Sequence, residues 1–68
     1  MRGPVMGAVR GATKAARSAY FDARSAGLTR AQSERYARRS IEALGVPERD
    51  ARVISERVQA EAEESLYV

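Results

Sequence analysis

The sequence predicts an all-α fold of three helices, in a small bundle or an open helical arrangement, forming one domain over residues 1–68. Three observations lead to this prediction. Ala, the best helix former, is abundant, with 13 in the chain of 68 residues. Gly27 and Gly45 divide the chain where helix ends are expected, because glycine adopts the left-handed conformation that commonly ends a helix. No segment alternates polar and apolar residues as strands do.

The first helix is predicted over residues 4–26, because Pro4 is tolerated in a first turn and Gly27 follows as a C-terminal stop. Residues placed at 100° intervals separate into an uncharged arc and a basic arc, with Tyr20 and Phe21 within or beside the basic one. Small residues recur at intervals of four, which allows helices to approach closely. The face expected to pack on other helices consists of Gly7, Gly11, Ala12, Ala15, Ala16, Ala19 and Ala23.

The second helix is predicted over residues 29–44. Thr29 is a favourable N-cap, and Gln32 at the third helical position completes a capping box. Gly45 is the expected residue just beyond the C-terminal end. The side of this helix expected to face inward carries Ser33, Tyr36, Ala37, Ser40, Ile41 and Leu44.

The third helix is predicted over residues 47–66. Pro47 suits the first helical position, and Glu48 and Asp50 in the first turn complement the positive end of the helix dipole. The apolar spacing along this segment predicts an inward stripe of Ala51, Ile54, Val58 and Ala62.

The residue types that are missing exclude most catalytic chemistry. The chain has no Cys and no His, so it lacks the thiolate, the commonest metal ligand and the commonest general base near neutral pH. Gly3, Gly7 and Gly11 are spaced by four, which does not match a phosphate-binding glycine loop. We therefore expect a protein that is not an enzyme and that uses no cofactor and no metal.

The N-terminal segment does not resemble a membrane or export sequence. Its longest stretch without charge, residues 3–9, is too short for a signal-peptide core or a transmembrane helix. The uncharged arc of the first helix is mostly alanine, which buries little area, so insertion into lipid would be weak. We expect a cytoplasmic protein with no membrane partner.

Charge is divided unequally along this basic chain, whose net charge is +3. Residues 1–39 carry nine basic and two acidic side chains, whereas residues 40–68 carry three basic and seven acidic ones. Three interpretations remain open: pairing between the halves, an anionic nucleic acid, or an acidic protein partner. The residues expected to contact an anionic partner are Arg10, Lys14, Arg17, Arg24, Arg35, Arg38 and Arg39.

Internal pairing would use the carboxylates of the third helix: Glu56, Glu61, Glu63 and Glu64. Two pairs within single helices are also predicted, because each has an acid four residues before an arginine. These pairs are Glu34 with Arg38 and Glu48 with Arg52.

Residues 40–54 resemble a helix-turn-helix unit. Residues 44–46 (Leu-Gly-Val) are similar to the turn of that family, and Ala51 and Ile54 fall where it places buried residues of its recognition helix. The resemblance covers about a quarter of the chain, and a helix–glycine–helix junction produces most of it.

This resemblance implies a DNA-binding unit at about residues 33–56, in which Arg49 and Arg52 would read bases. The sequence departs from the family pattern at Ile41, where the family usually has a small residue. It also departs at Glu48, which would face phosphates unfavourably.

Large apolar residues are few, since Leu, Ile, Val and Phe together number 12 in the chain. A small scaffold without disulfides or metal often gains stability by association. The sequence therefore predicts a homo-oligomer or a subunit ordered by a partner. We predict a small non-enzymatic interaction or assembly module, with a small nucleic-acid-binding regulator as the alternative.

Overall fold

A computed structural model describes residues 6–66 of the chain, and the side chains of residues 10–65 within that range. The described part contains α1 (Met6–Ser25), α2 (Arg30–Glu42) and α3 (Glu48–Leu66), without a strand. The predicted all-α fold of three helices is confirmed. The predicted helix start at Pro4 lies outside the described residues.

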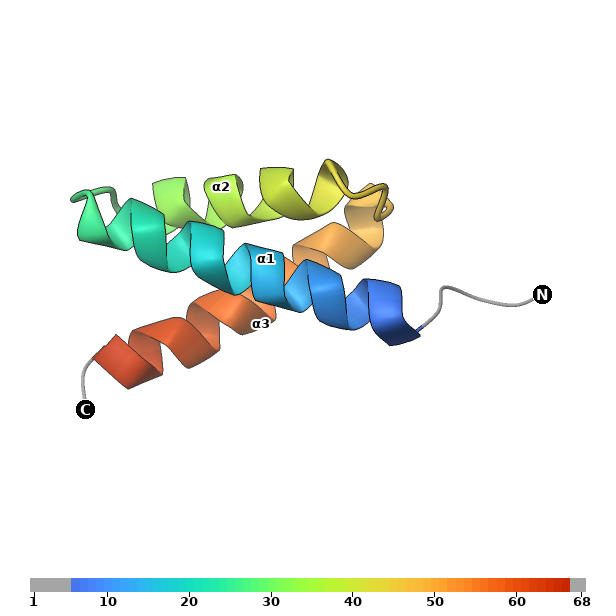
Figure 1. Cartoon of the computed structure of the whole chain (residues 1–68). Helices are drawn as coiled ribbons and strands as arrows, with labels where there is room; N and C mark the ends of the chain where they lie inside the picture. Colours follow the sequence, from blue (N-terminus) through green and yellow to red (C-terminus); the bar gives the residue numbers. More distant parts are fainter. Residues whose placement is uncertain (1–5, 67–68) are drawn as a thin grey trace.

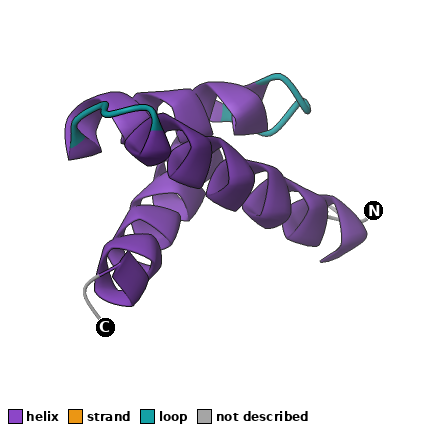
Figure 2. Ribbon diagram, turned by 60° about the vertical axis from the view of Figure 1, so that its left-hand side comes forward, coloured by secondary structure: helices purple, strands orange, loops and turns teal. Residues whose placement is uncertain are grey.

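The first two helices form an antiparallel hairpin, and α3 returns across one side of it (Figure 1). Viewed from another side, α3 crosses the hairpin at a steep angle instead of lying parallel to it (Figure 2). All three pairs of helices are in contact. Consequently α3 covers one side of the hairpin, and no helix of residues 6–66 covers the opposite side.

The end of α1 follows the prediction made from Gly27. This glycine has a φ of +94°, in the left-handed region. Its N–H donates to the carbonyl of Arg24 at 3.0 Å, and the N–H of Leu28 donates to the carbonyl of Ala23 at 3.1 Å. These two hydrogen bonds form a Schellman motif, which satisfies carbonyls that the helix leaves without a partner.

The capping box at the start of α2 is confirmed. The N–H of Gln32 donates to Thr29 Oγ1 at 3.1 Å, and the N–H of Thr29 donates to Gln32 Oε1 at 3.0 Å. Because two backbone donors are satisfied reciprocally, this local sequence determines where the second helix begins.

The boundaries between α2 and α3 differ slightly from the prediction. The second helix ends at Glu42 instead of Leu44, because the chain tightens there: the N–H of Leu44 donates to the carbonyl of Ile41, three residues back. Gly45 has a left-handed φ of +91°. Pro47 lies just before α3 instead of opening it, since its carbonyl accepts the first helical hydrogen bond, from Ala51, at 2.8 Å.

The core lies where the three helices meet. It is rich in alanine and contains Ala12, Ala16, Tyr20, Ala37, Ile41, Ala51, Val58 and Ala62. Phe21, Val46 and Ile54 pack against it while partly exposed. The predicted stripe of α3 therefore faces inward as expected, although Ile54 lies at its edge.

Tyr20 corrects the prediction for α1. The sequence placed it with the basic arc, but its side chain is fully buried and is the largest in the core. The alanines around it are too small to fill the space between three helices, so a large side chain next to them turns inward. Its hydroxyl is tolerated there because it donates a hydrogen bond to a carboxylate of α3, described below.

The inward face of α2 is narrower than predicted. Ser33, Ala37 and Ile41 are buried, whereas Tyr36 is 53% exposed and Leu44 is 59% exposed. These three buried residues are spaced by four and form one line along α2 that contacts the other helices. Tyr36 lies to the side of this line, and Leu44 lies beyond the end of the helix. The structure thus leaves a large aromatic side chain on the surface.

The small residues of α1 likewise include buried and exposed members. Ala12, Ala16 and Ala23 are buried, Ala15 and Ala19 are partly buried, and Gly11 is exposed. A Cβ placed on Gly11 would meet no atom within 4 Å. Close packing inside this chain therefore uses the alanines and not that glycine. The surroundings of Gly7 lie outside the described side chains.

Candidate interaction surface

A buried carboxylate from α3 joins all three helices. Glu63 accepts a hydrogen bond from the hydroxyl of Tyr20, and its Oε2 lies 2.8 Å from Arg24 Nε. Its Oε1 lies 3.3 Å from the Nε of Arg30, the first residue of α2. Arg24 also donates to the carbonyl of Leu28 at 2.8 Å, so the same side chain ties the α1–α2 turn to α3.

The charges of this cluster are fixed over the neutral pH range. Burial raises the pKa of Tyr20 to about 12, and the hydrogen bond to Glu63 adds to the shift. The hydrogen bond from Tyr20, together with that from Arg24, holds the pKa of Glu63 below its usual range despite burial. The phenol therefore stays protonated and the carboxylate stays ionised, which suits a structural link between helices.

A second buried carboxylate joins α2 to α3. Glu34 accepts hydrogen bonds from Arg38 Nε at 3.0 Å and from Arg38 Nη2 at 2.8 Å, which confirms this predicted pair. The Glu34 side chain also accepts a hydrogen bond from the hydroxyl of Ser55. The hydrogen bonds that Arg38 donates to Glu34 raise the pKa of Arg38 above its ordinary value. Arg38 is thus engaged inside the chain.

The sequence did not reveal these buried polar residues. Ser55 lies four residues after Ala51, on the inward stripe of α3, so the helical spacing could have predicted its burial. Glu34 and Glu63 lie beside the apolar stripes of their helices, where an exposed acid is the ordinary expectation. Their burial depends on arginine and hydroxyl groups that other helices bring opposite them.

The seven predicted anion-contact residues do not form one surface. Three of them pair inside the chain: Arg24 with Glu63, Arg38 with Glu34, and Arg17 with Glu61 at 3.1 Å. The predicted pairing between the basic and acidic halves is therefore present at Glu61 and Glu63, while Glu56 and Glu64 are exposed.

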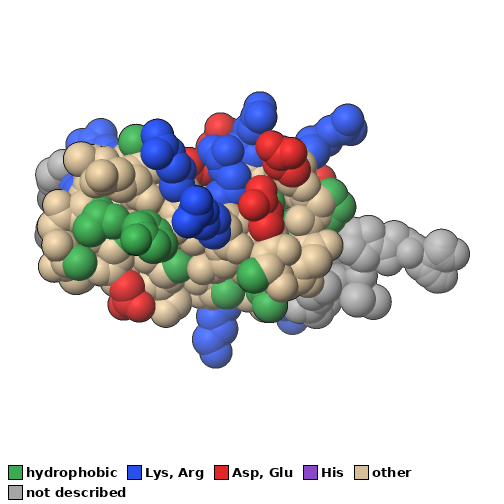
Figure 3. Space-filling view, turned by 90° about the horizontal axis from the view of Figure 1, so that it is seen from above, with side chains coloured by type: hydrophobic (Ala, Val, Ile, Leu, Met, Phe, Trp, Pro, Cys, Tyr) green, Lys and Arg blue, Asp and Glu red, His purple; other side chains and the backbone are tan. Residues whose placement is uncertain are grey.

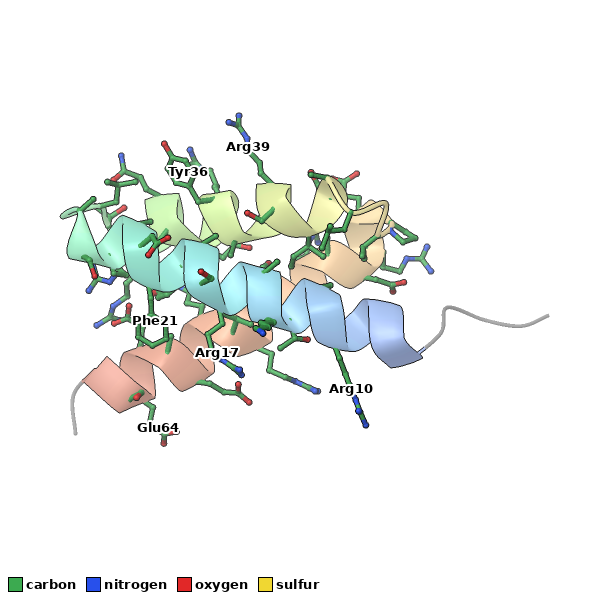
Figure 4. The ribbon with its side chains drawn as sticks, in the orientation of Figure 1. Arg10, Arg17, Phe21, Tyr36, Arg39 and Glu64 are labelled. Carbon is green, nitrogen blue, oxygen red and sulfur yellow. The ribbon has the colours of Figure 1, made fainter. Side chains whose placement is uncertain are left out.

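The other four predicted residues are exposed and form no ion pair with any described residue: Arg10, Lys14, Arg35 and Arg39. Arg39 and Tyr36 project from α2 away from α3, whereas Arg10 projects from α1 on the opposite side of the molecule (Figure 4). The predicted anion-contact residues therefore do not all lie on one face of the molecule.

The uncovered side of the α1–α2 hairpin contains two adjoining hollows. The larger has a volume of about 350 Å³ and is mostly apolar; it is lined by Ala19, Asp22, Ala23, Ala26, Leu28 and Tyr36. The smaller has a volume of about 210 Å³ and is lined by Leu28, Gln32, Arg35, Tyr36 and Arg39. We call the two together the outer groove. Leu28 and Tyr36 line both hollows.

From above α2, hydrophobic side chains gather next to Lys and Arg side chains on this side of the molecule (Figure 3). An exposed aromatic group beside arginines is the composition that interface centres favour. The groove therefore offers both apolar area and positive charge to a partner.

The residues of the helix-turn-helix resemblance lie elsewhere. Arg49 and Arg52 are exposed at the start of α3 and line a third hollow of about 500 Å³ with Glu48 and Val53. The pair predicted between Glu48 and Arg52 is not formed. A free carboxylate in this hollow opposes phosphate binding, because it would repel the nucleic-acid backbone.

No protein-family model, curated protein or solved structure matches this chain. Among residues 6–66, no helix is long and apolar enough to cross a bilayer. Within the same range, no three His, Cys, Asp or Glu side chains gather as a metal site would require.

Proposed function

We propose that this chain is a small non-enzymatic interaction module that binds an acidic protein surface through the outer groove. The observation that carries the proposal is the contrast among its arginines. Arg17 and Arg24 are paired with carboxylates of α3, whereas Arg35 and Arg39 are exposed beside Tyr36, next to the apolar hollow, and form no ion pair with a described residue. Unpaired arginines next to an exposed aromatic ring attract carboxylates and bury apolar area together.

A nucleic-acid partner has less support. Phosphate tracks require basic side chains aligned along one face, and Arg10 and Arg39 project on opposite sides of the molecule. Nucleic acid therefore serves as the competing outcome of the test.

The test compares binding of a fluorescent poly-glutamate peptide and of a labelled DNA duplex as salt is raised. Poly-glutamate should bind at low salt and weaken as salt increases. Arg35→Glu with Arg39→Glu should abolish this binding. Arg49→Glu with Arg52→Glu is the matched control, because it changes net charge equally on another face. Duplex binding that is tighter than peptide binding and is lost in the control variant would overturn the proposal.

The test avoids charge reversal at Arg17 and Arg24. Both pair with α3, so reversing them would disturb the packing of the helices as well as the surface charge.

A further inference from the structure

The outer groove has a shape and a charge pattern that specify its occupant more closely. We infer that it holds one amphipathic helix of an acidic partner protein, with an apolar side chain in the larger hollow and carboxylates on Arg35 and Arg39. This inference rests on the proposed function and names the partner of the same site.

The shape of the groove favours a helix. An antiparallel helix pair offers a groove on each side, and α3 occupies only one of them. On the other side, α1 contributes the small side chains of Ala19, Ala23 and Ala26. Small side chains allow another helix to approach at the usual separation of about 8–10 Å. Grooves of this kind commonly bind an amphipathic helix through its apolar face.

The charges favour an acidic helix. Arg35 and Arg39 are four residues apart on α2, a rise of about 6 Å along the helix axis. Carboxylates four residues apart on a partner helix repeat the same spacing. Arginine forks bind carboxylates through paired hydrogen bonds, so two such contacts would fix the register of the partner.

The opposite edge of the groove sets the orientation of the partner about its axis. Asp22, on α1, is exposed, lines the larger hollow and forms no ion pair with a described residue. It would repel a carboxylate placed over α1. The acidic edge of the partner must therefore lie over α2, with neutral or basic side chains over Asp22.

A second copy of this chain fits the groove less well. If the second copy offered α3, the exposed side of that helix would present Glu56 and Glu64 together with Arg57. Docking that side would bring an arginine towards Arg35 and Arg39 as well as carboxylates. A partner helix with acids alone along one edge avoids this repulsion.

The experiment uses the full chain and two synthetic peptides of equal charge. The first is a helical peptide with Leu at positions i and i+4 on one face and Glu along one neighbouring edge. The second replaces each Leu by Gln. We expect the Leu peptide to bind about tenfold more tightly than the Gln peptide, because only the first can fill the hollow.

Two variants locate the binding. Tyr36→Ala, and Arg35→Glu with Arg39→Glu, should each weaken binding of the Leu peptide by about tenfold or more. Val53→Ala is the matched apolar control, since Val53 is 55% exposed on another face. Arg49→Glu with Arg52→Glu is the charge control. Both controls should change binding by less than about twofold, and thermal unfolding checks that every variant folds.

Each other outcome has a defined meaning. If no Glu-rich probe binds, the proposed function itself fails. If poly-glutamate and both helical peptides bind equally and Tyr36→Ala has no effect, the inference fails while the proposed function stands. If light scattering shows an oligomer that Tyr36→Ala converts to a monomer, the groove takes a second copy. Binding to anionic vesicles that displaces the Leu peptide would also overturn a protein helix as the occupant.

Discussion

The two sides of the α1–α2 hairpin use the same residue types, a tyrosine and an arginine, for opposite purposes. Facing α3, Tyr20 is fully buried and Arg24 is 2.8 Å from the carboxylate of Glu63. Across the hairpin, Tyr36 is 53% exposed and Arg39 forms no ion pair with a described residue. The difference lies in the position of α3, which places the carboxylate of Glu63 against Tyr20 and Arg24 and does not face Tyr36 and Arg39. A tyrosine and an arginine are structural where a carboxylate meets them and are available to a partner where none does.

The largest expected effect compares the same substitution on the two sides. Tyr20→Ala should lower the free energy of unfolding by about 3–5 kcal/mol, because it opens a cavity and removes a donor from Glu63. Tyr36→Ala should change it by less than about 0.5 kcal/mol. Urea unfolding followed by circular dichroism measures both. Equal losses would show that the outer groove is as structural as the side covered by α3.

A second comparison uses the arginines. The Arg24 side chain is only 26% exposed and donates both to Glu63 and to the carbonyl of Leu28. Arg24→Ala should therefore lower the free energy of unfolding by about 1.5–3 kcal/mol. Arg39→Ala should leave it within about 0.5 kcal/mol. The same urea titrations apply, and a large loss from Arg39→Ala would contradict the assignment of Arg39 to a free surface.

Stability should also depend on pH through the Tyr20–Glu63 contact. Since the folded pKa of Glu63 is lowered, its contribution is present above the pKa in the unfolded chain and is lost as pH falls through the folded value. Since the pKa of Tyr20 is raised from 10.0 to about 12, its contribution is present below about pH 10 and is lost as pH rises towards 12.

Thermal melts across pH test this contact. Glu63→Gln should reduce the decrease in Tm that the original chain shows as pH falls. Tyr20→Phe should lower Tm at pH 7 by about 4–8 °C, for a hydrogen bond of about 1 kcal/mol, and should reduce the loss between pH 10 and 12. Tyr36→Phe is the control and should keep the alkaline loss of the original chain. An alkaline loss that disappears in this control instead would place the sensitive tyrosine on the open side.

The smallest change in stability is expected at the exposed ion pair between α1 and α3. Arg17 and Glu61 form an ion pair at 3.1 Å, but their side chains are 49% and 54% exposed. Arg17→Ala should cost less than about 1 kcal/mol, and about 1 M salt should remove the difference. A larger loss of unfolding free energy that does not depend on salt would show that the Arg17–Glu61 pair also stabilises the contact between α1 and α3.

The local features of the fold could be predicted from the sequence. The capping box at Thr29 and Gln32, the left-handed Gly27 and the acidic first turn of α3 each depend on residues that are neighbours in the chain. Such signals act within one helical turn, so a linear pattern contains them. The boundary after Glu42 was less predictable, because the helix tightens over its last residues before Gly45 turns the chain.

The candidate site could be predicted only in part. The sequence indicated that arginines would meet an acidic surface, and some of them do so inside the chain, at Glu61 and Glu63. The exposure of Tyr36 was missed, because helical periodicity placed it on the inward side of α2. Periodicity gives the angle of a residue around its own helix, but it does not give the width of the face that its neighbours cover.

By itself, the sequence determined three helices, the capping box of α2, the glycine turn after α1 and the excess of positive charge in the first part of the chain. These follow from propensity, capping and charge count, which need no long-range contact. Only the tertiary structure decided which tyrosine became core and which arginines stayed unpaired. That choice depends on the path of α3, which lies across one side of the hairpin, carries Glu63 there and leaves the outer groove open.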